Sequence, residues 1–298
     1  MIVVQDNSLG RKMFHIVNYT VLILVSLICV LPFVNLLAVS FSSSASVSAG
    51  EVMFWPVDFN TKAYEYALKG DEFFRSMWVS LQRVVLGTLV NLILMVLAAY
   101  PLSKTKEKVL GRGIYMGFFV FTMLFNGGLI PTYLIVVQTG LIDSIWSLIL
   151  PGAIPVFSMI ILMNFLRGLP EEIEESATID GAGPIQILVQ ILLPLLKPAL
   201  ATVGLFSIVG HWNSWFDGII YMNDTANYPL QSYLQTLLLN FEQIMLRAST
   251  DYTQLLAMMN VRTGRAAQMF LGAIPILAIY PFLQKYFTTG LVLGSVKG

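Results

Sequence analysis

Long apolar stretches recur along the whole chain, and each has about the length needed to cross a membrane. A transmembrane helix needs about 20 mostly apolar residues, and six segments meet this requirement. They are residues 14–39, 77–102, 113–137, 146–166, 198–220 and 266–288. Lipid offers no partner for a free backbone N–H or C=O group, so each segment is expected to be helical. The pattern predicts an all-α polytopic membrane protein with six transmembrane helices.

Prolines interrupt several of these apolar stretches. They lie at positions 32, 131, 155, 275 and 281, and Gly127 and Gly128 precede the second of them. A proline removes a backbone donor and tends to kink a helix. Ordinary irregularity of membrane helices accounts for this pattern, and so do broken helices in a bundle that rocks between two openings. The sequence leaves both interpretations open. The third and fourth spans are the least clearly separated, with only residues 138–144 between them.

Lysine and arginine are unequally distributed between the connections. With a cytoplasmic N-terminus, the inner segments hold Arg11, Lys12, Lys104, Lys106, Lys108, Arg112, Arg167, Lys197, Lys285 and Lys297. The outer loops, which are longer, hold Lys62, Lys69, Arg75, Arg247, Arg262 and Arg265. Because positive charges are enriched in cytoplasmic loops, both termini are expected to be cytoplasmic. The organisation is then an N-terminal segment 1–13, a membrane domain 14–288 with a cytoplasmic loop 168–197, and a tail 289–298.

Arg83 falls inside the second predicted span. A long basic side chain can reach the membrane surface while its methylene groups stay in lipid. We therefore expect either that Arg83 snorkels in this way or that the span begins after it. The two longer outer connections, 40–76 and 221–265, are expected to form partly helical caps.

Composition agrees with a chain that faces lipid. Hydrophobic residues make up 56% and charged residues 11%, against about 45–50% and 25% in soluble domains. The zero net charge gives no reason to expect a nucleic-acid partner. Cys29 is the only cysteine and His15 and His211 the only histidines, so we expect no disulfide within the chain and no metal site. The first apolar stretch is too long for a signal peptide and is read as a retained span.

The loop at 168–197 has the pattern of two short helices joined by a sharp turn. Pro170 suits the first position of a helix, and four glutamates follow it near the positive end of the helix dipole. Asp180 and Gly181 are expected to end this helix, with Gly181 in the left-handed conformation. Pro184 is suited to begin the second helix.

The second helix of this loop carries an apolar stripe. Its members recur at helical spacing and are Ile185, Leu188, Leu192 and Leu195. Two interpretations stay open for this stripe: it docks another protein at the inner face of the membrane, or it packs beneath its own bundle.

The same loop resembles the EAA loop of ABC-importer permeases, which reads Glu-Ala-Ala-x3-Gly-x9-Ile-x-Leu-Pro. The matching residues are Glu175, Ser176, Ala177, Gly181, Ile191, Leu193 and Pro194. Ser176, in place of the first alanine, is the only departure. Leu-Pro-Glu-Glu at 169–172, Asp180-Gly181-Ala182 and the final residues 294–298 resemble the oligosaccharide-uptake branch, of the maltose-transporter type. The resemblance covers about residues 13–298.

This resemblance implies a permease subunit in the bacterial inner membrane that is not itself an enzyme. In that family the EAA loop docks into a groove of a separate ATPase. Glu175, Ser176, Ala177, Asp180 and Gly181 would then form the docking element, and Ile191 and Pro194 would set the return to the membrane. The implied partners are a second homologous permease, two ATPase subunits that bind ATP and Mg, and an extracytoplasmic solute-binding protein. The chain has no phosphate-binding Gly-Lys-Ser or Gly-Lys-Thr sequence and needs no cofactor of its own.

Candidate sugar-contacting residues gather near the end of the fifth predicted span. Trp212 and Trp215 are three residues apart, which predicts one side of a helix, and Asn213, Ser214 and Asp217 lie nearby. Tryptophan is also enriched as an anchor at membrane interfaces, so this second interpretation stays open. Asn126 and Tyr133 are weaker candidates for the substrate pathway, because polar residues in spans often bond to a neighbouring helix. The stretch 126–133 resembles permeases for oligosaccharides from complex, sometimes acidic, polysaccharides.

Three other functions compete with an oligosaccharide importer. A carrier driven by an ion gradient would need carboxylates or histidines within the membrane, and Asp217 meets this only loosely. A membrane enzyme would need a metal cluster or a nucleophile–base pair in the spans, and none is visible in the sequence. An ABC permease for a solute other than sugar would keep the same docking loop.

Overall fold

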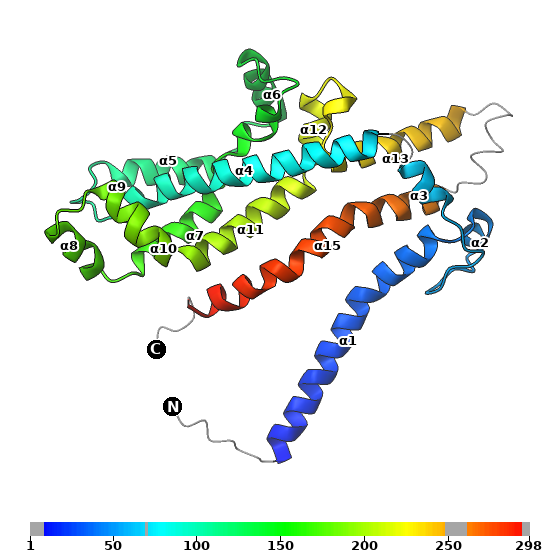
Figure 1. The fold of residues 1–298 in the computed structure, drawn as a ribbon, viewed down its shortest axis with the longest axis horizontal. Helices are drawn as coiled ribbons and strands as arrows, with labels where there is room; N and C mark the ends of the chain where they lie inside the picture. The colour runs from blue at the N-terminus through cyan, green and yellow to red at the C-terminus, as the bar shows by residue number, and fades with distance from the viewer. Residues whose placement is uncertain (1–8, 69–70, 248–260, 294–298) are drawn as a thin grey trace. The chain divides into compact units, whose positions relative to one another are not determined.

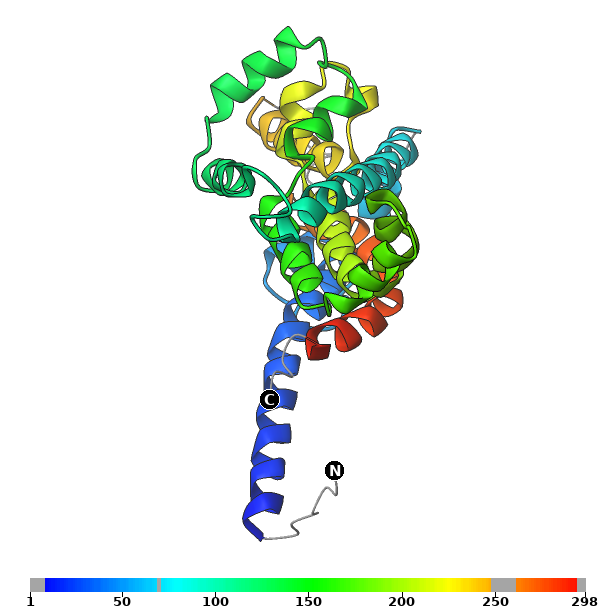
Figure 2. The same cartoon turned by 90° about the vertical axis from the view of Figure 1, so that its left-hand side faces the viewer.

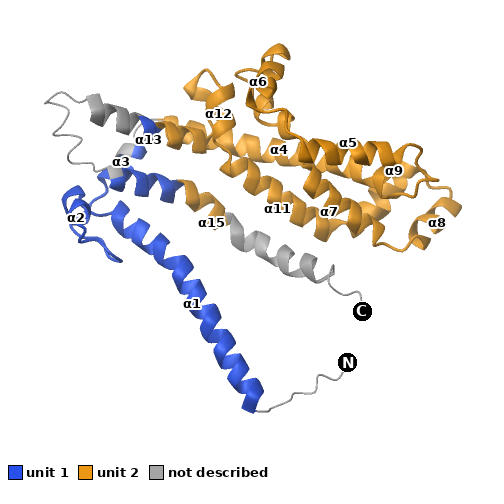
Figure 3. Cartoon of the chain, turned by 180° about the vertical axis from the view of Figure 1, so that it is seen from behind, with its two compact units in different colours: residues 1–69, 237–271 blue, residues 70–236, 272–298 orange. Residues whose placement is uncertain are grey.

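The computed structural model describes residues 9–68, 71–247 and 261–293, and every regular element in these ranges is a helix (Figure 1). The all-α prediction is confirmed for this part of the chain. Two compact units are distinguished in Figure 3: residues 1–69 with 237–271, and residues 70–236 with 272–298.

The first unit begins with one long apolar helix. This helix, α1 (Leu9–Ser40), contains the first predicted span and is followed by α2 (Ser44–Ser48) and α3 (Lys62–Ala67). Beyond α1, the Phe41 ring stacks on Phe59 and Tyr64 with centroid distances of 5.3 and 4.7 Å. The Ser40 hydroxyl also bonds to the Tyr64 hydroxyl at 2.8 Å. Burial raises the pKa of Tyr64, although this hydrogen bond acts in the opposite direction. The predicted partly helical character of residues 40–76 is confirmed for the described residues.

The second unit contains most of the remaining helices. Its elements are α4 (Glu72–Ser103), α5 (Arg112–Leu124), α6 (Leu129–Gln138), the 3₁₀ turns η1 (Ile145–Leu148) and η2 (Leu150–Gly152), α7 (Val156–Arg167), α8 (Glu172–Ile179), α9 (Pro184–Gln186), the π-helix η3 (Ile187–Leu192), α10 (Leu193–Leu195), α11 (Lys197–Asn213), α12 (Phe216–Tyr221) and the 3₁₀ turn η4 (Thr225–Asn227). Two further helices, α13 (Leu230–Arg247) and α15 (Val261–Leu293), have residues in both units.

The core of the second unit lies where α4, α7 and α11 run side by side (Figure 1). Its fully buried side chains include Met95, Met159, Leu162, Leu192 and Val203. The buried face of α4 changes character along the helix. Its last part, from Met95 on, contributes Met95, Val96, Ala99 and Leu102, whereas the part up to Asn91 contributes Phe73 and the mainly polar set Ser76, Ser80, Arg83, Gly87 and Asn91. The polar part is therefore turned toward protein and away from lipid, as polar side chains in a membrane helix must be.

Membrane crossing by length and composition is clear for two helices, α1 and α4. Three more candidate spans are bent pairs: α5 with α6 at 114°, Ile145–Gly152 with α7 at 53°, and Pro184–Leu195 with α11 at 82°. The described residues thus hold two to five candidate spans. The sixth predicted span, 266–288, lies within α15, whose side chains are described only as far as residue 278.

The third and fourth predicted spans are not continuous α-helices. The third is interrupted at residues 125–128, where Gly128 has φ +90° and donates to the Asn126 side chain at 2.8 Å. Glycine adopts this conformation without steric strain, so the chain can turn sharply here. Both Figure 1 and Figure 2 show α6 turned away from α5. The fourth span starts with the turns η1 and η2, and its α-helix begins only after Pro155.

The fifth predicted span also ends earlier than predicted. The α11 helix stops at Asn213, and Ser214 is extended with ψ 124°. A continuous helix to residue 220 is therefore wrong. The physical reason lies outside the segment, because the freed Ser214 carbonyl is bound by Arg83 from α4 at 3.3 Å.

Candidate functional site

The loop at 168–197 contains the predicted helix, turn and second helix. The first helix, α8, begins at Glu172, two residues later than Pro170 had suggested, and three glutamates lie in its first turn. Gly181 has φ +84°, which confirms the predicted left-handed turn. The turn is closed by hydrogen bonds from Gly181 N to Thr178 O at 3.0 Å and from Ala182 N to Ala177 O at 2.9 Å. Pro184 begins the second helix, as predicted.

The apolar stripe predicted on the second helix does not form one face. Leu188 and Leu192 are buried at 6% and 0% exposure, whereas Ile185 is 79% and Leu195 41% exposed. Residues 187–192 form a π-helix, whose wider turns change the angular spacing of successive side chains. The single stripe is therefore wrong. Its buried members pack on the core of α4 and α7, in agreement with packing beneath the bundle.

Several residues of the EAA-like motif nevertheless remain accessible on this loop. Glu175, Ser176, Asp180, Gly181 and Pro194 are exposed, while Ala177 is buried and Ile191 partly buried against the core. The motif thus divides into an outward set and an inward set.

An apolar surface accompanies the exposed part of the motif. Ile179 is 85% exposed, next to a cleft of about 800 Å³ between α8 and the end of α4. Pro101, Val109 and Ile187 contribute to the apolar wall of this cleft, and Glu175 lies at its edge. The geometry suits a surface that receives a partner's side chains.

Charged side chains join α8 to the connection that follows α4. Lys104 forms an ion pair with Glu174, and Lys108 Nζ lies 3.7 Å from Glu171 Oε2. Lys104 Nζ also lies 4.4 Å from the centroid of the Tyr100 ring. Sequence reasoning missed this attachment, although acidic α8 and the lysines at 104–108 are opposite in charge.

Two guanidinium groups bind a backbone carbonyl in the last turn of α4. Arg112 Nε and Arg167 Nη2 donate to the Leu102 carbonyl at 2.7 and 3.1 Å. Cations at this position favour the negative end of the helix dipole. In the adjoining connection, hydrogen bonds from its own backbone N–H and from the Thr105 hydroxyl lower the pKa of Glu107.

Reversing the charge of Lys104 tests the attachment of α8. The Lys104→Glu variant places two carboxylates together, and we expect a loss on the order of 1 kcal/mol of stability. The swapped variant Lys104→Glu/Glu174→Lys should recover most of it, because the two side chains are only 15% and 23% exposed and keep opposite charges. Thermal unfolding of the purified variants measures both the loss and its recovery. Lys106→Glu, at an exposed position of the same connection, is the control. A loss as large in that control would contradict the assignment.

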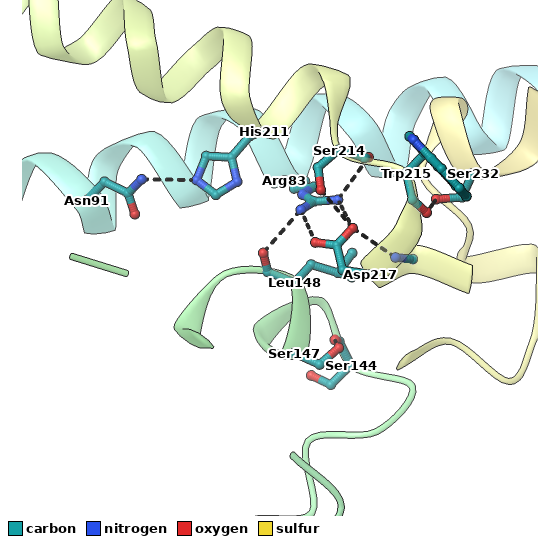
Figure 4. A network of polar contacts seen from close by, with 11 residues as sticks. Arg83, Asn91, Ser144, Ser147, Leu148, His211, Ser214, Trp215, Asp217 and Ser232 are labelled. Atoms are coloured by element: carbon teal, nitrogen blue, oxygen red, sulfur yellow. Dashed lines mark hydrogen bonds and ion pairs between the residues drawn. The ribbon is translucent and has the colours of Figure 1, made fainter. Parts of the chain in front are cut away.

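A polar network lies at the other end of the α4–α11 contact (Figure 4). Arg83 is 2% exposed and pairs bidentately with Asp217: Nη1 lies 3.1 Å from Oδ1, and Nη2 contacts Oδ2. The Oδ1 atom also accepts from Ser214 Oγ and from Gly218 N, each at 2.9 Å. The expectation that Arg83 snorkels is wrong, because its guanidinium is buried. A span that begins after Arg83 stays a prediction, because α4 starts at Glu72 and is longer than a bilayer requires. The Asp217 carboxylate, just after the break that follows α11, neutralises the Arg83 guanidinium.

Arg83 also satisfies backbone carbonyls at two helix ends. Nη1 donates to Ser214 O at 3.3 Å, between α11 and α12, and Nη2 donates to Leu148 O at 3.4 Å, at the end of η1. Lipid cannot hydrogen-bond such carbonyls, so broken helices at membrane depth need protein donors. One side chain thus supports the breaks in two candidate spans.

The network continues along α4 and α11 through Asn91. Its amide lies 2.8 Å from Ser207 Oγ and 3.2 Å from His211 Nε2. With its nitrogen turned toward the carbonyls of Gly87 and Ala153, the Asn91 amide has a partner on every side. Gly87 permits this packing, because an added Cβ would lie 2.6 Å from Cε1 of the His211 ring. Glycine at 87 therefore sets the close approach of the two helices.

The residues predicted for the substrate pathway are placed in different environments. Trp212 is buried and donates from Nε1 to Gly272 O at 3.2 Å, whereas Trp215 precedes α12 and is 41% exposed. The prediction that they share one side of a helix is wrong, because α11 ends between them. Asn213 is exposed. Asp217 and the neighbouring Ser214 belong to the Arg83 network.

The two candidates from the third predicted span, Asn126 and Tyr133, also lie in different environments. Asn126 is exposed and accepts from the Gly128 N–H at 2.8 Å. Tyr133 stacks on Tyr221 with ring centroids 6.3 Å apart. The Tyr221 side chain lies at the edge of the Arg83 network, so Tyr133 is the nearer of the two to that network.

Comparisons with known proteins give a consistent result, although no family model matches the chain. It is 41% identical over 294 residues to protein LplC of Bacillus subtilis (strain 168), covering 99% of this chain and 98% of that protein. It is 40% identical over 293 residues to the polygalacturonan/rhamnogalacturonan transport system permease protein YtcP of the same organism, covering 97% and 99%. A solved bacterial ABC transporter involved in the import of the acidic polysaccharide alginate matches with a TM-score of 0.81 and 32% identity, covering 94% of this chain and 98% of that chain.

Proposed function

Since this chain belongs to the family of permease subunits of ABC carbohydrate importers, we propose that it passes oligosaccharides inward through six transmembrane helices. The family assignment makes it the non-catalytic membrane component of an importer complex, in a bacterial membrane. The observation that carries it is about 40% identity over nearly the whole length of two relatives. Both termini and the loop 168–197 face the cytoplasm in this proposal, which the lysine and arginine distribution supports.

The proposed complex has four kinds of component. This chain pairs with a second, homologous permease, and the two together bind two ATPase subunits and receive sugar from an extracytoplasmic binding protein. ATP and Mg bind to the ATPase subunits. An ABC transporter for alginate, similar to this chain along 94% of its length, supports this arrangement.

Coupling to the ATPase is proposed to run through residues 171–194. Four members of the outward set, Glu175, Ser176, Asp180 and Gly181, form the docking surface together with the exposed Ile179. The inward residues Ala177 and Ile191 pack on the core of α4 and α7. A push on α8 therefore reaches the candidate spans through direct contacts and through the Lys104–Glu174 ion pair.

The substrate is proposed to be an oligosaccharide derived from an acidic polysaccharide. A 40% identical relative is described as a permease for polygalacturonan and rhamnogalacturonan, and the matching solved transporter imports alginate. Both substrates contain sugar acids. Asp217, Trp212, Asn213, Trp215, Asn126 and Tyr133 remain our candidates along the pathway.

Reconstitution of the complete importer tests this function. We expect ATP hydrolysis to rise when binding protein and trigalacturonate are added to membranes that contain the permeases and ATPase. Glu175→Lys should lower this stimulation at least tenfold, because it reverses an exposed charge on the docking surface. Glu51→Lys, exposed in the other unit, is the matched control. Transport that persists without any ATPase would instead indicate a carrier driven by an ion gradient.

A further inference from the structure

A cavity of about 380 Å³ lies beside the Arg83 network, between α4, α11 and the turns that precede α7. Its volume is within the range of small-molecule sites, about 300–1,000 Å³. Polar side chains, including Arg83, Ser158, Asp217 and Tyr221, line it together with apolar ones such as Leu148 and Phe206. Such a cavity within a bundle of apolar helices is not explained by the packing of the chain alone, because polar groups at this depth need partners.

One buried polar atom at this cavity has no hydrogen-bond partner among the described residues. Arg83 Nε is buried and makes no hydrogen bond within the described residues. The side chains of Ser158 and Tyr221, which carry hydroxyl groups, also line the cavity. An unmade hydrogen bond at a buried donor is unfavourable, so Arg83 Nε is suited to a ligand or water that supplies an oxygen atom. The two hydroxyl groups can donate to or accept from the same ligand.

The walls of the cavity leave room for a ring. Gly152 and Gly210 line it from opposite elements, and a Cβ added to either would meet no atom within 4 Å. The rings of Phe206 and Tyr221 provide apolar surface beside these polar groups. A sugar ring offers hydroxyl groups that both donate and accept, and C–H faces that pack on aromatic rings.

The charge of the cavity favours hydroxyl groups over a free ion. Asp217 neutralises Arg83, and both Arg83 Nη atoms are occupied by Asp217 and backbone carbonyls. Only Nε remains for a ligand, so one oxygen atom can be bound there without breaking the ion pair. A hydroxyl, a ring oxygen or one oxygen of a uronate meets this requirement.

We propose that this cavity binds one pyranose ring of the transported oligosaccharide, through Arg83 Nε and the hydroxyl groups of Ser158 and Tyr221. The inference rests on the proposed import function and adds that this permease contacts the sugar itself. The bound ring is either neutral or a uronate, since both present the same hydroxyl and ring oxygens.

Filling the cavity tests this site in the complete reconstituted importer. Gly210→Leu and Gly152→Leu each add a side chain where the structure has open space, so we expect assembly of the complex to persist. Uptake of trigalacturonate or galactotriose, whichever the wild-type importer transports faster, should fall at least tenfold in both variants. Gly117→Leu, which adds the same side chain to an open position of α5, should transport normally. Normal uptake in both cavity variants would overturn the proposal.

A labelling experiment separates sugar binding from a structural role. In a Cys29→Ala background, Ser158→Cys should react with a methanethiosulfonate reagent through the cavity. The transported trisaccharide should slow this reaction at least threefold, while labelling of Thr139→Cys, an exposed site outside the cavity, should not change. Equal rates with and without sugar, in an importer that transports it, would mean that the cavity holds only water. An importer stimulated by no oligosaccharide would contradict the proposed function instead.

Discussion

Replacing Arg83 by methionine should leave little folded permease. The substitution removes one partner of a buried ion pair and leaves the Asp217 carboxylate without its counter-charge, which typically lowers stability by about 3–5 kcal/mol. It also removes the donor for the carbonyls of Leu148 and Ser214 at two helix ends. We expect the melting temperature of the purified protein in detergent to fall steeply, together with the yield of monodisperse protein.

Removing both charges separates the two roles of Arg83. The double variant Arg83→Met/Asp217→Leu has no uncompensated charge, so it should be more stable than Arg83→Met alone. Recovery should be incomplete, because both backbone carbonyls still lack their donor. Arg75→Met makes the same change at an exposed position of α4 and should behave as the wild type. Full stability of Arg83→Met would show that the buried pair does not hold the helix breaks together.

Placing valine at Gly181 should abolish coupling while the candidate spans remain folded. Gly181 has φ +84°, a region in which a β-branched residue is a strong outlier. The turn between α8 and α9 must therefore change, which displaces the proposed docking surface. In the reconstituted importer we expect sugar-stimulated ATP hydrolysis to fall at least tenfold, with little change in the melting temperature of the permease.

Gly183 offers a matched control for this substitution. It lies two residues away, has φ −76°, and like Gly181 has no atom within 4 Å of an added Cβ. Gly183→Val should therefore retain most of the stimulation, since its backbone conformation is open to any residue. Equal losses in the two variants would show that side-chain bulk on the loop, and not the left-handed turn, disturbs docking.

Hydrophobicity was enough to locate the candidate spans, but not to find their breaks. The first two predicted spans lie inside α1 and α4, because length and apolar composition decide whether a helix can cross lipid. The break at residues 214–215 depends on Arg83, which is more than a hundred residues away in the sequence. No local pattern reveals such a partner. The break before Gly128 did have a local signal, since two glycines precede Pro131.

The loop at 168–197 shows the same limit on a smaller scale. The turn at Gly181 was predictable, because an Asp-Gly pair after a helical segment has a local conformational cause. The π-helix at 187–192 was not, because the spacing of Ile185 and Leu188 fits an ordinary α-helix and nothing local marks the wider turn. The inward packing of Leu188 and Leu192 on α4 and α7 is a tertiary contact that outweighs this local spacing.

The ion pairs of α8 carry a consequence for how the chain is threaded. Lys104 with Glu174 and Lys108 with Glu171 hold the residues after α4 and those at the start of α8 at one end of α4. This 32-residue helix is about 48 Å long. Its two ends therefore lie on opposite sides of any bilayer that it crosses.

The opposite end of α4 is marked by a second group of contacts. Asp143 accepts from the Asp224 N–H at 3.4 Å and from the Asn227 amide at 3.1 Å. The Leu230 N–H donates to Ser80, in the first third of α4, at 2.7 Å. The connection that contains Asp143 is thus tied to the segment that lies beside the beginning of α4.

These two groups of contacts favour a broken span over a re-entrant hairpin for α5 with α6. The chain leaves α4 at its Ser103 end. By residue 143 it is tied to the segment beside the first third of α4, and by residue 171 it is back at the Ser103 end. This path needs two traverses in opposite directions, one by α5 with α6 and one by η1 through α7. We therefore expect the sharply bent α5–α6 pair to carry the chain across. A membrane-impermeant label should accordingly reach residues 104–111 and residues 139–144 from opposite compartments.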